Sequence, residues 1–285
     1  MNNIDFSEVT DFEPIGDKRS VFFGKLYGNG KTISNLGILG EGETEDIGLF
    51  GNIYNAQIAS LTLDDNCFVI GYGYIGGIVG NANESSIEYC INKATISGCH
   101  DFAGICGRAV DTTFLYCKNN GEVKADFASY GTSCWGMAGI TANAVNCKFL
   151  ECRNEHEFNV VDARVRVIGG IAGEAEGGEI TNCKNTANLT GYYQMGGIVG
   201  FFKNGKISNC ENSGDISATI SSGNASIAGI VGNTDYSIIE KCRNSGNISL
   251  VGSVSANYTG GIAGYFNTGC TKPYISNILR NNNLF

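Results

Sequence analysis

A short glycine-bounded motif recurs along this chain at intervals that restrict what it can fold into. Glycine, an aliphatic residue, one variable residue and a second glycine occur in eight copies, the fourth closed by alanine. The copies are Gly48–Gly51, Gly77–Gly80, Gly104–Gly107, Gly139–Ala142, Gly170–Gly173, Gly197–Gly200, Gly229–Gly232 and Gly261–Gly264. Successive copies start 27 to 35 residues apart. A period of this size indicates an array of stacked units instead of one globular core.

A second block follows each motif at a constant distance. Ten residues after the motif there is a cysteine in six copies and Leu61 in the first, and an asparagine stands two residues after each cysteine. The two columns are Cys90, Cys117, Cys152, Cys183, Cys210, Cys242 and Asn92, Asn119, Asn154, Asn185, Asn212, Asn244. Only the stretch before the next motif varies in length, so we expect a fixed coil cross-section with its loops on one side.

The residues within each period predict strands. Glycine interrupts every period, and the short segments are rich in Ile, Val, Thr and Tyr and end at Asn-Ser-Gly turns such as 212–214. The Ile, Cys and Asn spacing is similar to that of leucine-rich repeats, but the rest of the period lacks a helical segment. We therefore predict an all-β, right-handed parallel β-solenoid (β-helix) of about eight coils, in which each residue stacks about 4.8 Å from its counterpart.

A single domain over residues 1–285 is expected, with a first coil or cap over 1–47, repeats over 48–264 and an atypical C-terminal coil or cap over 265–285. The motif glycines are expected to supply positive φ at corners and to let coils approach closely. Two departures stand out. Ala142 replaces a closing glycine, which is expected to reshape that corner. The last copy reaches its ladder position, Ile278, after fourteen residues, with Cys270 in the insertion.

Charge and hydropathy exclude several classes of partner. The net charge of −9 disfavours nucleic acid and anionic membrane surfaces, because both need clustered Lys and Arg. No apolar run approaches the length of about 20 residues that spans a bilayer. The N-terminus lacks the basic and apolar regions of a signal peptide. Either the protein is cytosolic or the sequence is a piece of a longer exported chain.

The pattern of cysteines indicates packing in the core more than disulfide or metal chemistry. The column cysteines are expected to stay reduced in the core, because parallel side chains in register do not present the dihedral angle of a disulfide. Cys99 and Cys134 each lie five residues before a motif and form a possible disulfide. With two histidines and no C-x-x-C, no metal site and no cofactor are expected. The asparagines are expected to stack their amides along the axis, with sugar binding as the alternative.

Two further columns carry charge. Glu122 and Glu157 each follow a column cysteine by five residues, so stacking predicts a separation of roughly 5 Å, which would suit a retaining glycosidase. Because the same column continues with ordinary turn residues, a solvated face is favoured and no catalytic residue is assigned. One residue after the cysteines runs a basic stripe, expected to be solvated, with a polyanionic glycan as the alternative: Lys118, Arg153, Lys184 and Arg243, broken by Glu211.

Aromatic residues in the variable segments are the best candidates for ligand binding, because exposed rings stack on sugars and anchor protein partners. Tyr72 and Tyr192 share a repeat position four coils apart, so they cannot form one site. The candidates are Phe127, Tyr130, Trp135, Tyr192 and Tyr193.

The first 51 residues resemble the opening of a GLUG-motif repeat region. The residues that carry the resemblance are Phe12-Glu13-Pro14-Ile15-Gly16, Gly28-Asn29-Gly30-Lys31-Thr32-Ile33 and Gly48-Leu49-Phe50-Gly51. The later Gly-Gly-Ile-Val-Gly blocks resemble continuing repeats, so the resemblance extends from about Phe12 to Ile278. Such regions occur in large bacterial surface proteins, including adhesin-like proteins and some immunoglobulin A-cleaving metallopeptidases. The resemblance implies an extracellular or cell-surface, non-catalytic role beside flanking domains.

These observations predict a structural and adhesive module: a rigid stalk or ligand-presenting rod of a bacterial surface protein. Its partner would be a host or microbial glycan or a surface protein, without nucleic acid binding or membrane insertion. One alternative is a polysaccharide-degrading lyase or glycosidase on a β-helix. Another is a self-assembling filament subunit, because an open end coil can template a second chain. Function is expected on the variable half, around residues 124–136 and 159–168.

Overall fold

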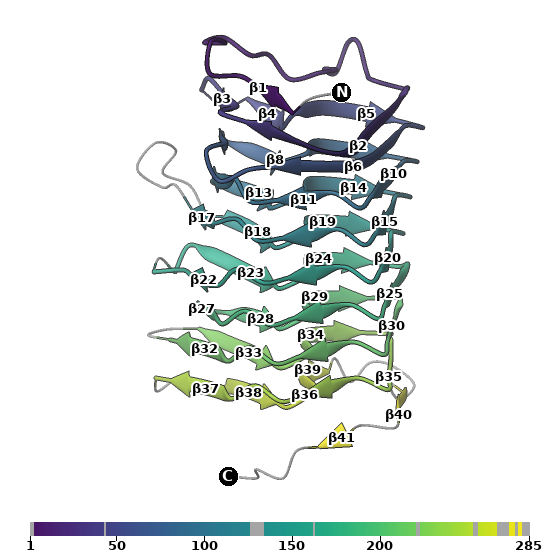
Figure 1. Ribbon diagram of the computed structural model, residues 1–285. Helices are drawn as coiled ribbons and strands as arrows, with labels where there is room; N and C mark the ends of the chain where they lie inside the picture. The colour runs from purple at the N-terminus through teal and green to yellow at the C-terminus, as the bar shows by residue number, and fades with distance from the viewer. Residues whose placement is uncertain are drawn as a thin grey trace.

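The computed structural model shows parallel strands stacked coil upon coil (Figure 1). It describes residues 3–42, 44–125, 134–161, 163–220, 223–252, 256–266, 274–276 and 279–280. The predicted parallel β-solenoid of about eight coils is confirmed, since the described elements are strands and their pairings are parallel. Within these ranges no helix is long and apolar enough to cross a membrane.

One side of the stack is a 17-stranded sheet, here called the base sheet, to which most coils contribute two short strands. Its strands are β1 (Ile4–Asp5), β2 (Lys25–Ser34), β6 (Gln57–Leu63), β10 (Ser86–Glu88), β11 (Ile91–Asn92), β15 (Thr113–Leu115), β16 (Lys118–Asn119), β20 (Lys148–Leu150), β21 (Arg153–Asn154), β25 (Glu179–Thr181), β26 (Lys184–Asn185), β30 (Lys206–Ser208), β31 (Glu211–Asn212), β35 (Ile238–Glu240), β36 (Arg243–Asn244), β40 (Tyr274–Ser276) and β41 (Leu279–Arg280).

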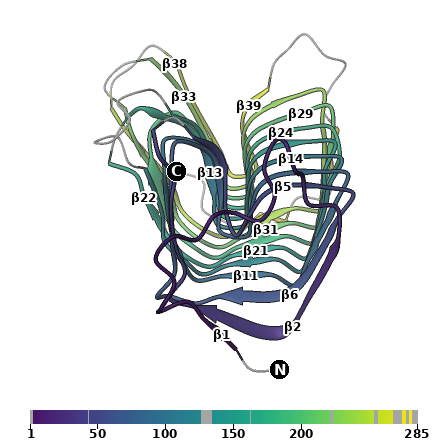
Figure 2. The same cartoon turned by 90° about the horizontal axis from the view of Figure 1, so that it is seen from above.

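Two eight-stranded sheets, here called the first and second wall sheets, diverge from a corner that points back toward the base sheet (Figure 2). The first wall sheet contains β4 (Glu45–Ile47), β8 (Gly73–Gly76), β13 (His100–Ala103), β18 (Cys134–Ala138), β23 (Val165–Gly169), β28 (Gln194–Gly196), β33 (Asn224–Ala228) and β38 (Ala256–Gly260). The second contains β5 (Phe50–Tyr54), β9 (Val79–Asn83), β14 (Cys106–Val110), β19 (Thr141–Val145), β24 (Ala172–Glu176), β29 (Val199–Lys203), β34 (Val231–Asp235) and β39 (Ala263–Phe266).

The remaining side of the stack is interrupted. It consists of two four-stranded sheets, one for the first coils and one for the later coils. The first has β3 (Gly37–Leu39), β7 (Phe68–Ile70), β12 (Thr95–Gly98) and β17 (Val123–Ala125), and the second has β22 (Phe158–Asn159), β27 (Leu189–Gly191), β32 (Ile216–Thr219) and β37 (Ile248–Val251). The longest period, 35 residues between Gly104 and Gly139, falls at this break. The loop-bearing side therefore divides the stack, while the base and wall sheets continue through it.

The six asparagines form one hydrogen-bonded ladder along the stack. Each side-chain amide nitrogen donates to the amide oxygen of the asparagine in the next coil, at 2.7 to 3.0 Å. The same amide groups donate to the carbonyl oxygen two residues ahead, as Asn92 does to Ala94. The five from Asn92 to Asn212 are fully buried. A buried amide chain of this kind fixes the register, because shifting one coil would leave polar groups without partners.

The first glycine of six motifs, from Gly77 to Gly229, packs directly against this ladder. A methyl group added at Gly77 would lie 2.6 Å from Asn92 Oδ1, and one at Gly170 would lie 2.7 Å from Asn185 Oδ1. The corner between the wall sheets therefore reaches the base sheet, and only a residue without a side chain fits there. These glycines have ordinary φ values, so the expected positive φ at the motif is wrong and close approach alone requires glycine.

Positive φ occurs instead at other positions of the coils, and among the described residues asparagine accounts for seven of the eighteen other than glycine that adopt it. One such column contains Asn55, Asn146 and Asn204, and another contains Asn182 and Asn209. Asparagine tolerates the left-handed region better than most residues with a side chain. This preference explains part of the high asparagine content of the repeats.

The closing residue of the motif lies on the opposite side of the same corner, where it packs against the first wall sheet. A methyl group on Gly107 would lie 2.4 Å or less from the backbone of Tyr74 and Ile75 in the first wall sheet. In the fourth coil the closing residue is Ala142, which packs with Ala103 and Ala138. The register there places Gly136 at the first-wall position that faces the corner. The structure thus accommodates Ala142 with a glycine across the corner.

The column cysteines lie in register inside the core. Their thiols donate weakly to carbonyl groups of the preceding coil, as Cys117 Sγ does to the Ile87 oxygen at 3.2 Å. Phe114 and Phe149 stack beside the column with ring centroids 4.9 Å apart. Burial raises the pKa of the Cys90 thiol to about 12. Each thiol therefore acts as a small apolar side chain with one weak hydrogen bond.

Removing one rung of the asparagine ladder should destabilise the fold. Asn154→Ala leaves the buried amide of Asn119 and the amide oxygen of Asn185 each short of one partner. We expect a loss of about 1–3 kcal/mol in the free energy of unfolding, measured by guanidinium denaturation. The control is Asn159→Ala on exposed β22, expected to cost less than about 0.5 kcal/mol. Equal effects of the two substitutions would contradict a structural role for the ladder.

The buried thiols should also make the fold sensitive to alkali. A thiol whose folded pKa lies near 12, above its ordinary value of 9.0, stabilises the fold fully below pH 9 and loses that contribution as pH rises toward 12. Unfolding measured between pH 7 and pH 12 should show this decline. Cys90→Ala should decline less steeply, and alkylation mapped by mass spectrometry should leave Cys90 unmodified in the folded protein at pH 8. Rapid alkylation of Cys90 at pH 8 would be inconsistent with this burial.

Candidate functional site

The outer faces of the two wall sheets meet at the corner, and their side chains contact one another across it. The Arg108 guanidinium of the second wall lies 5.7 Å from the ring centroid of Tyr74 of the first. At the far end of the stack, the rings of Tyr258 and Tyr265 are 4.5 Å apart. In each pair, one residue lies on a strand of the first wall sheet and the other on a strand of the second. The corner therefore brings polar and aromatic side chains of both walls together.

In the third coil the corner holds a small charged cluster. Asp101 is buried. The Nδ1 atom of the adjacent His100 lies 3.5 Å from Asp101 Oδ2. The hydrogen bond with Asp101 raises the pKa of His100. Across the corner, burial and the charge of Asp101 raise the pKa of Glu174. The His100 ring also lies between Tyr72, with centroids 6.3 Å apart, and Tyr74, at 6.4 Å.

A pocket of about 660 Å³ opens on the first wall sheet in the next coils. Trp135 and Tyr193, two of the predicted binding aromatics, line it together. The other lining residues are Ala163, Arg164, Arg166, Val167, Gln194, Gly223 and Asn224. Half of the Trp135 surface is exposed, and the Arg166 guanidinium lies 5.9 Å from its ring centroid. The pocket thus combines aromatic faces, guanidinium groups and side-chain amides.

The remaining predicted aromatics have other places. Tyr192 packs against the core, and its hydroxyl donates to the Val161 carbonyl at 2.8 Å, so it holds the edge of the coil. Phe127 and Tyr130 lie outside the described residues. Sequence spacing did not reveal that Trp135 and Tyr193 share a pocket, because the intervening periods differ in length. The signal available was their common offset before the motif glycine, four residues before Gly139 and Gly197.

The possible disulfide stays a prediction. The register of β13 with β18 pairs Phe102 with Met137, and the same offset places Cys99 opposite Cys134. Cys99 is buried, whereas the side chain of Cys134 lies outside the described residues.

The two glutamates considered for catalysis are both exposed. Glu122 precedes β17 and Glu157 precedes β22, and these strands belong to different sheets on either side of the break. Glu122 is exposed and pairs with Lys124, Oε2 to Nζ 2.9 Å. Residues of β17 and β22 still contact one another across the break, so the separation of roughly 5 Å stays a prediction. Both glutamates lie on an exposed face of the coil.

The basic stripe on the base sheet is largely neutralised by neighbouring acids. Lys118 pairs with Glu155 at 2.5 Å, and Glu211 pairs with Lys184 at 3.1 Å and with Arg243 at 3.9 Å. These pairs are partly exposed, and pairs that are accessible to water contribute little to stability. They leave the stripe poorly suited to a polyanion.

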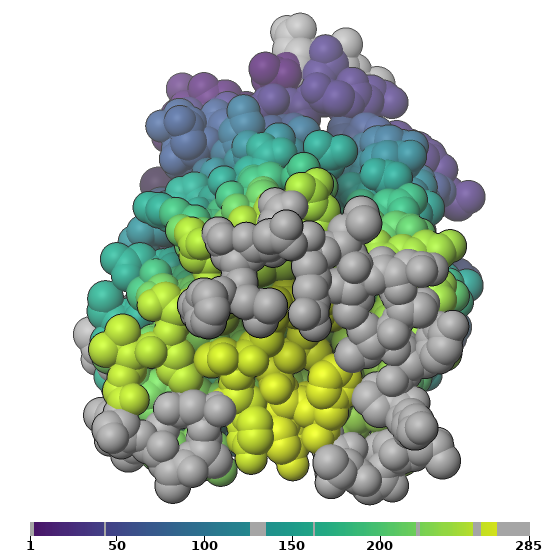
Figure 3. Space-filling model, turned by 90° about the horizontal axis from the view of Figure 1, so that it is seen from below, coloured from purple at the N-terminus to yellow at the C-terminus, as the bar shows by residue number. Residues whose placement is uncertain are grey.

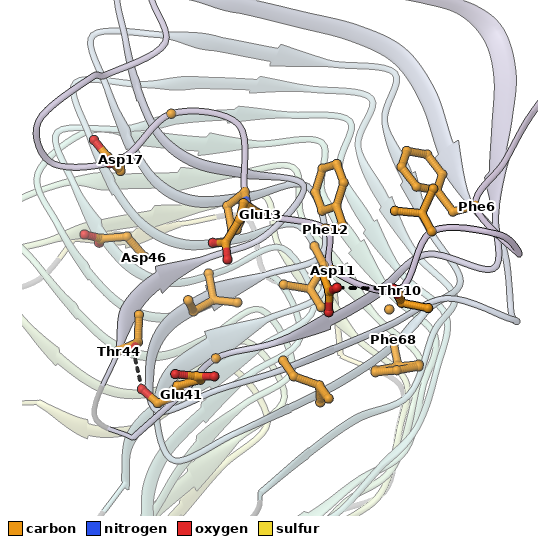
Figure 4. Close-up of a pocket in the computed structure, with 18 of the residues that line it drawn as sticks. Phe6, Thr10, Asp11, Phe12, Glu13, Asp17, Glu41, Thr44, Asp46 and Phe68 are labelled. Carbon is orange, nitrogen blue, oxygen red and sulfur yellow. Dashed lines mark hydrogen bonds between the residues drawn. The ribbon is translucent and has the colours of Figure 1, made fainter.

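A second pocket, of about 1400 Å³, lies where the N-terminal segment joins the first coil (Figure 4). Several acids line it, among them Asp11, Glu13 and Glu41. Its buried carboxylate, Asp46, is 3.5 Å from Lys18 Nζ. Within the described ranges, no group of three or more His, Cys, Asp or Glu side chains is placed to hold a metal ion. The pocket is best described as the junction between the end segment and the stack.

Comparisons with known proteins agree with the repeat. The family described as the GLUG motif matches residues 166–190, within the fifth coil. Halomucin of Haloquadratum walsbyi is 30% identical over 105 residues, which are 36% of this chain and 1% of halomucin. A solved structure titled IgA1 Protease superposes with a TM-score of 0.36 at 15% identity, covering 95% of this chain and 20% of that one.

This chain spans only a small part of either relative. The matched segment contains one complete motif and its cysteine and asparagine positions, and the same positions repeat in register through the stack. The chain is therefore a parallel β-solenoid whose residues 166–190 match the GLUG motif.

Proposed function

We propose that this chain is a non-catalytic segment of a larger cell-surface protein, a stiff rod that carries ligand-binding side chains on its variable face. The observation that carries the proposal is the connectivity of the stack. Strand β1 lies at one end of the axis and β41 at the other (Figure 1). A unit that the chain enters at one end and leaves at the other can be placed in series within a longer protein.

Stiffness along the axis supports the same proposal. Backbone hydrogen bonds of the base and wall sheets run coil to coil, and the buried asparagine ladder runs parallel to them. Bending the rod would lengthen these bonds on one side. Figure 3 views the stack from its C-terminal end, where the described residues of the last coils are yellow. GLUG-motif regions occur in bacterial surface proteins, which favours an extracellular or cell-surface location.

The rod model predicts one fixed end-to-end distance. Spin labels at Lys25 in β2 and Ser245 after β36, both exposed, should give a single narrow distance distribution by pulsed electron paramagnetic resonance. The distribution should stay unchanged at denaturant concentrations below the unfolding transition, because repeats of this type are coupled to their neighbours. A broad distribution in buffer would contradict a stiff rod.

The non-catalytic assignment predicts that no glycan is cleaved. Neither the wild-type chain nor the double variant Glu122→Gln/Glu157→Gln should release reducing ends from polygalacturonate or neutral polysaccharides. Glycan release by the wild type that disappears in the double variant would reassign the chain as an enzyme.

A further inference from the structure

One column of the first wall sheet differs from the columns around it. The register of β13, β18, β23 and β28 aligns His100, Trp135, Arg166 and Tyr193 in four consecutive coils. Neighbouring coils are about 4.8 Å apart, so the four side chains form a row roughly 14 Å long parallel to the axis. The row alternates cationic or ionisable groups with aromatic rings.

The pocket described above lies on this row. Trp135 and Tyr193 provide ring faces, Arg166 lies between their coils, and Arg164 lines the same wall. Aromatic faces stack on the apolar faces of sugar rings, and guanidinium groups bind carboxylates through paired hydrogen bonds. Gln194 and Asn224 add amides that donate to and accept from hydroxyl groups. Each of these groups has a counterpart in an acidic sugar.

The charge of this surface is opposite to that of the chain. The protein has a net charge of −9, and two cations of the base sheet, Lys184 and Arg243, are paired with Glu211. The pocket is lined by two arginines, and the described residues that line it include no acidic one. Beside it, the hydrogen bond with Asp101 raises the pKa of His100 and so favours its cationic form. Electrostatic complementarity therefore favours an anionic ligand.

We propose that the row His100, Trp135, Arg166 and Tyr193, with Arg164, binds a linear acidic oligosaccharide of the uronic acid class along the solenoid axis. The proposal rests on the ligand-presenting role proposed above and names the ligand for that role. Successive sugar rings would meet successive coils, with rings stacked on Trp135 and Tyr193 and a carboxylate held by Arg166. The spacing of the coils would thus match the spacing of the sugar rings in a repeating polymer.

Trp135 is the only tryptophan in the chain, so its fluorescence reports on this site directly. Tri-galacturonate should change the emission in a saturable way, and maltotriose, a neutral trisaccharide, should not at equal concentration. Calorimetry should give the same dissociation constant. Arg166→Gln and Tyr193→Ala should each weaken binding by about tenfold, since each removes one charge-assisted or stacking contact.

The matched control is Arg243→Gln, the same substitution on the base sheet, expected to leave affinity unchanged within about twofold. Melting curves of the exposed variants should match the wild type, which separates loss of binding from loss of fold. The proposal would be overturned if Arg166→Gln and Arg243→Gln weakened binding equally, or if maltotriose bound as tightly as tri-galacturonate. Tighter binding of oligothymidylate would also overturn it, in favour of a single-stranded nucleic acid. A narrow label-to-label distance without any binding would refute the ligand and leave the rod intact.

Discussion

The contact between the motif glycines and the asparagine ladder is the constraint on which the whole cross-section depends. A parallel solenoid with a round section would need no such contact. Here the corner between the wall sheets reaches inward until Gly170 meets Asn185, so the two walls diverge like the arms of a V (Figure 2). The ladder then serves two purposes, because its amides link successive coils and its surface receives the glycines. This dual role explains why glycine and asparagine recur together in six of the repeats.

The inward corner has a consequence on the outside. Two sheet faces that would point away from each other in a convex section instead converge, so side chains such as Arg108 and Tyr74 meet across the corner. A solenoid normally exposes separate flat faces, and a binding site must be assembled along one of them. In this chain the corner collects polar groups from both walls, and the first wall sheet adds the pocket around Trp135.

The stack is regular where polar groups are buried and irregular where they are exposed. The base and wall sheets pass without interruption through the long insertion after β17, because the asparagine ladder and the Phe114–Phe149 stack continue beneath it. Of the two four-stranded sheets, in contrast, the first ends and the second begins at this insertion. Side chains that could bind ligands gather near this break, where the chain has freedom to vary without disturbing buried hydrogen bonds.

The sequence by itself determined the architecture, because in-register stacking turns every constant spacing into a spatial column. The steps to Cys90 and Asn92 in one repeat and to Cys117 and Asn119 in the next were enough to predict parallel strands, their register and a stacked amide ladder. What stacking could not supply was the shape of the coil. Whether a glycine turns the backbone or admits a neighbour depends on which sheet lies behind it, and here close approach, not positive φ, requires the motif glycines. Trp135 and Tyr193 have the same offset before their motif glycines, but that offset does not show which other residues gather around them to form a pocket. Only the tertiary structure decided that, because the continuous first wall sheet places both residues on one face and the variable segments before it supply other lining residues.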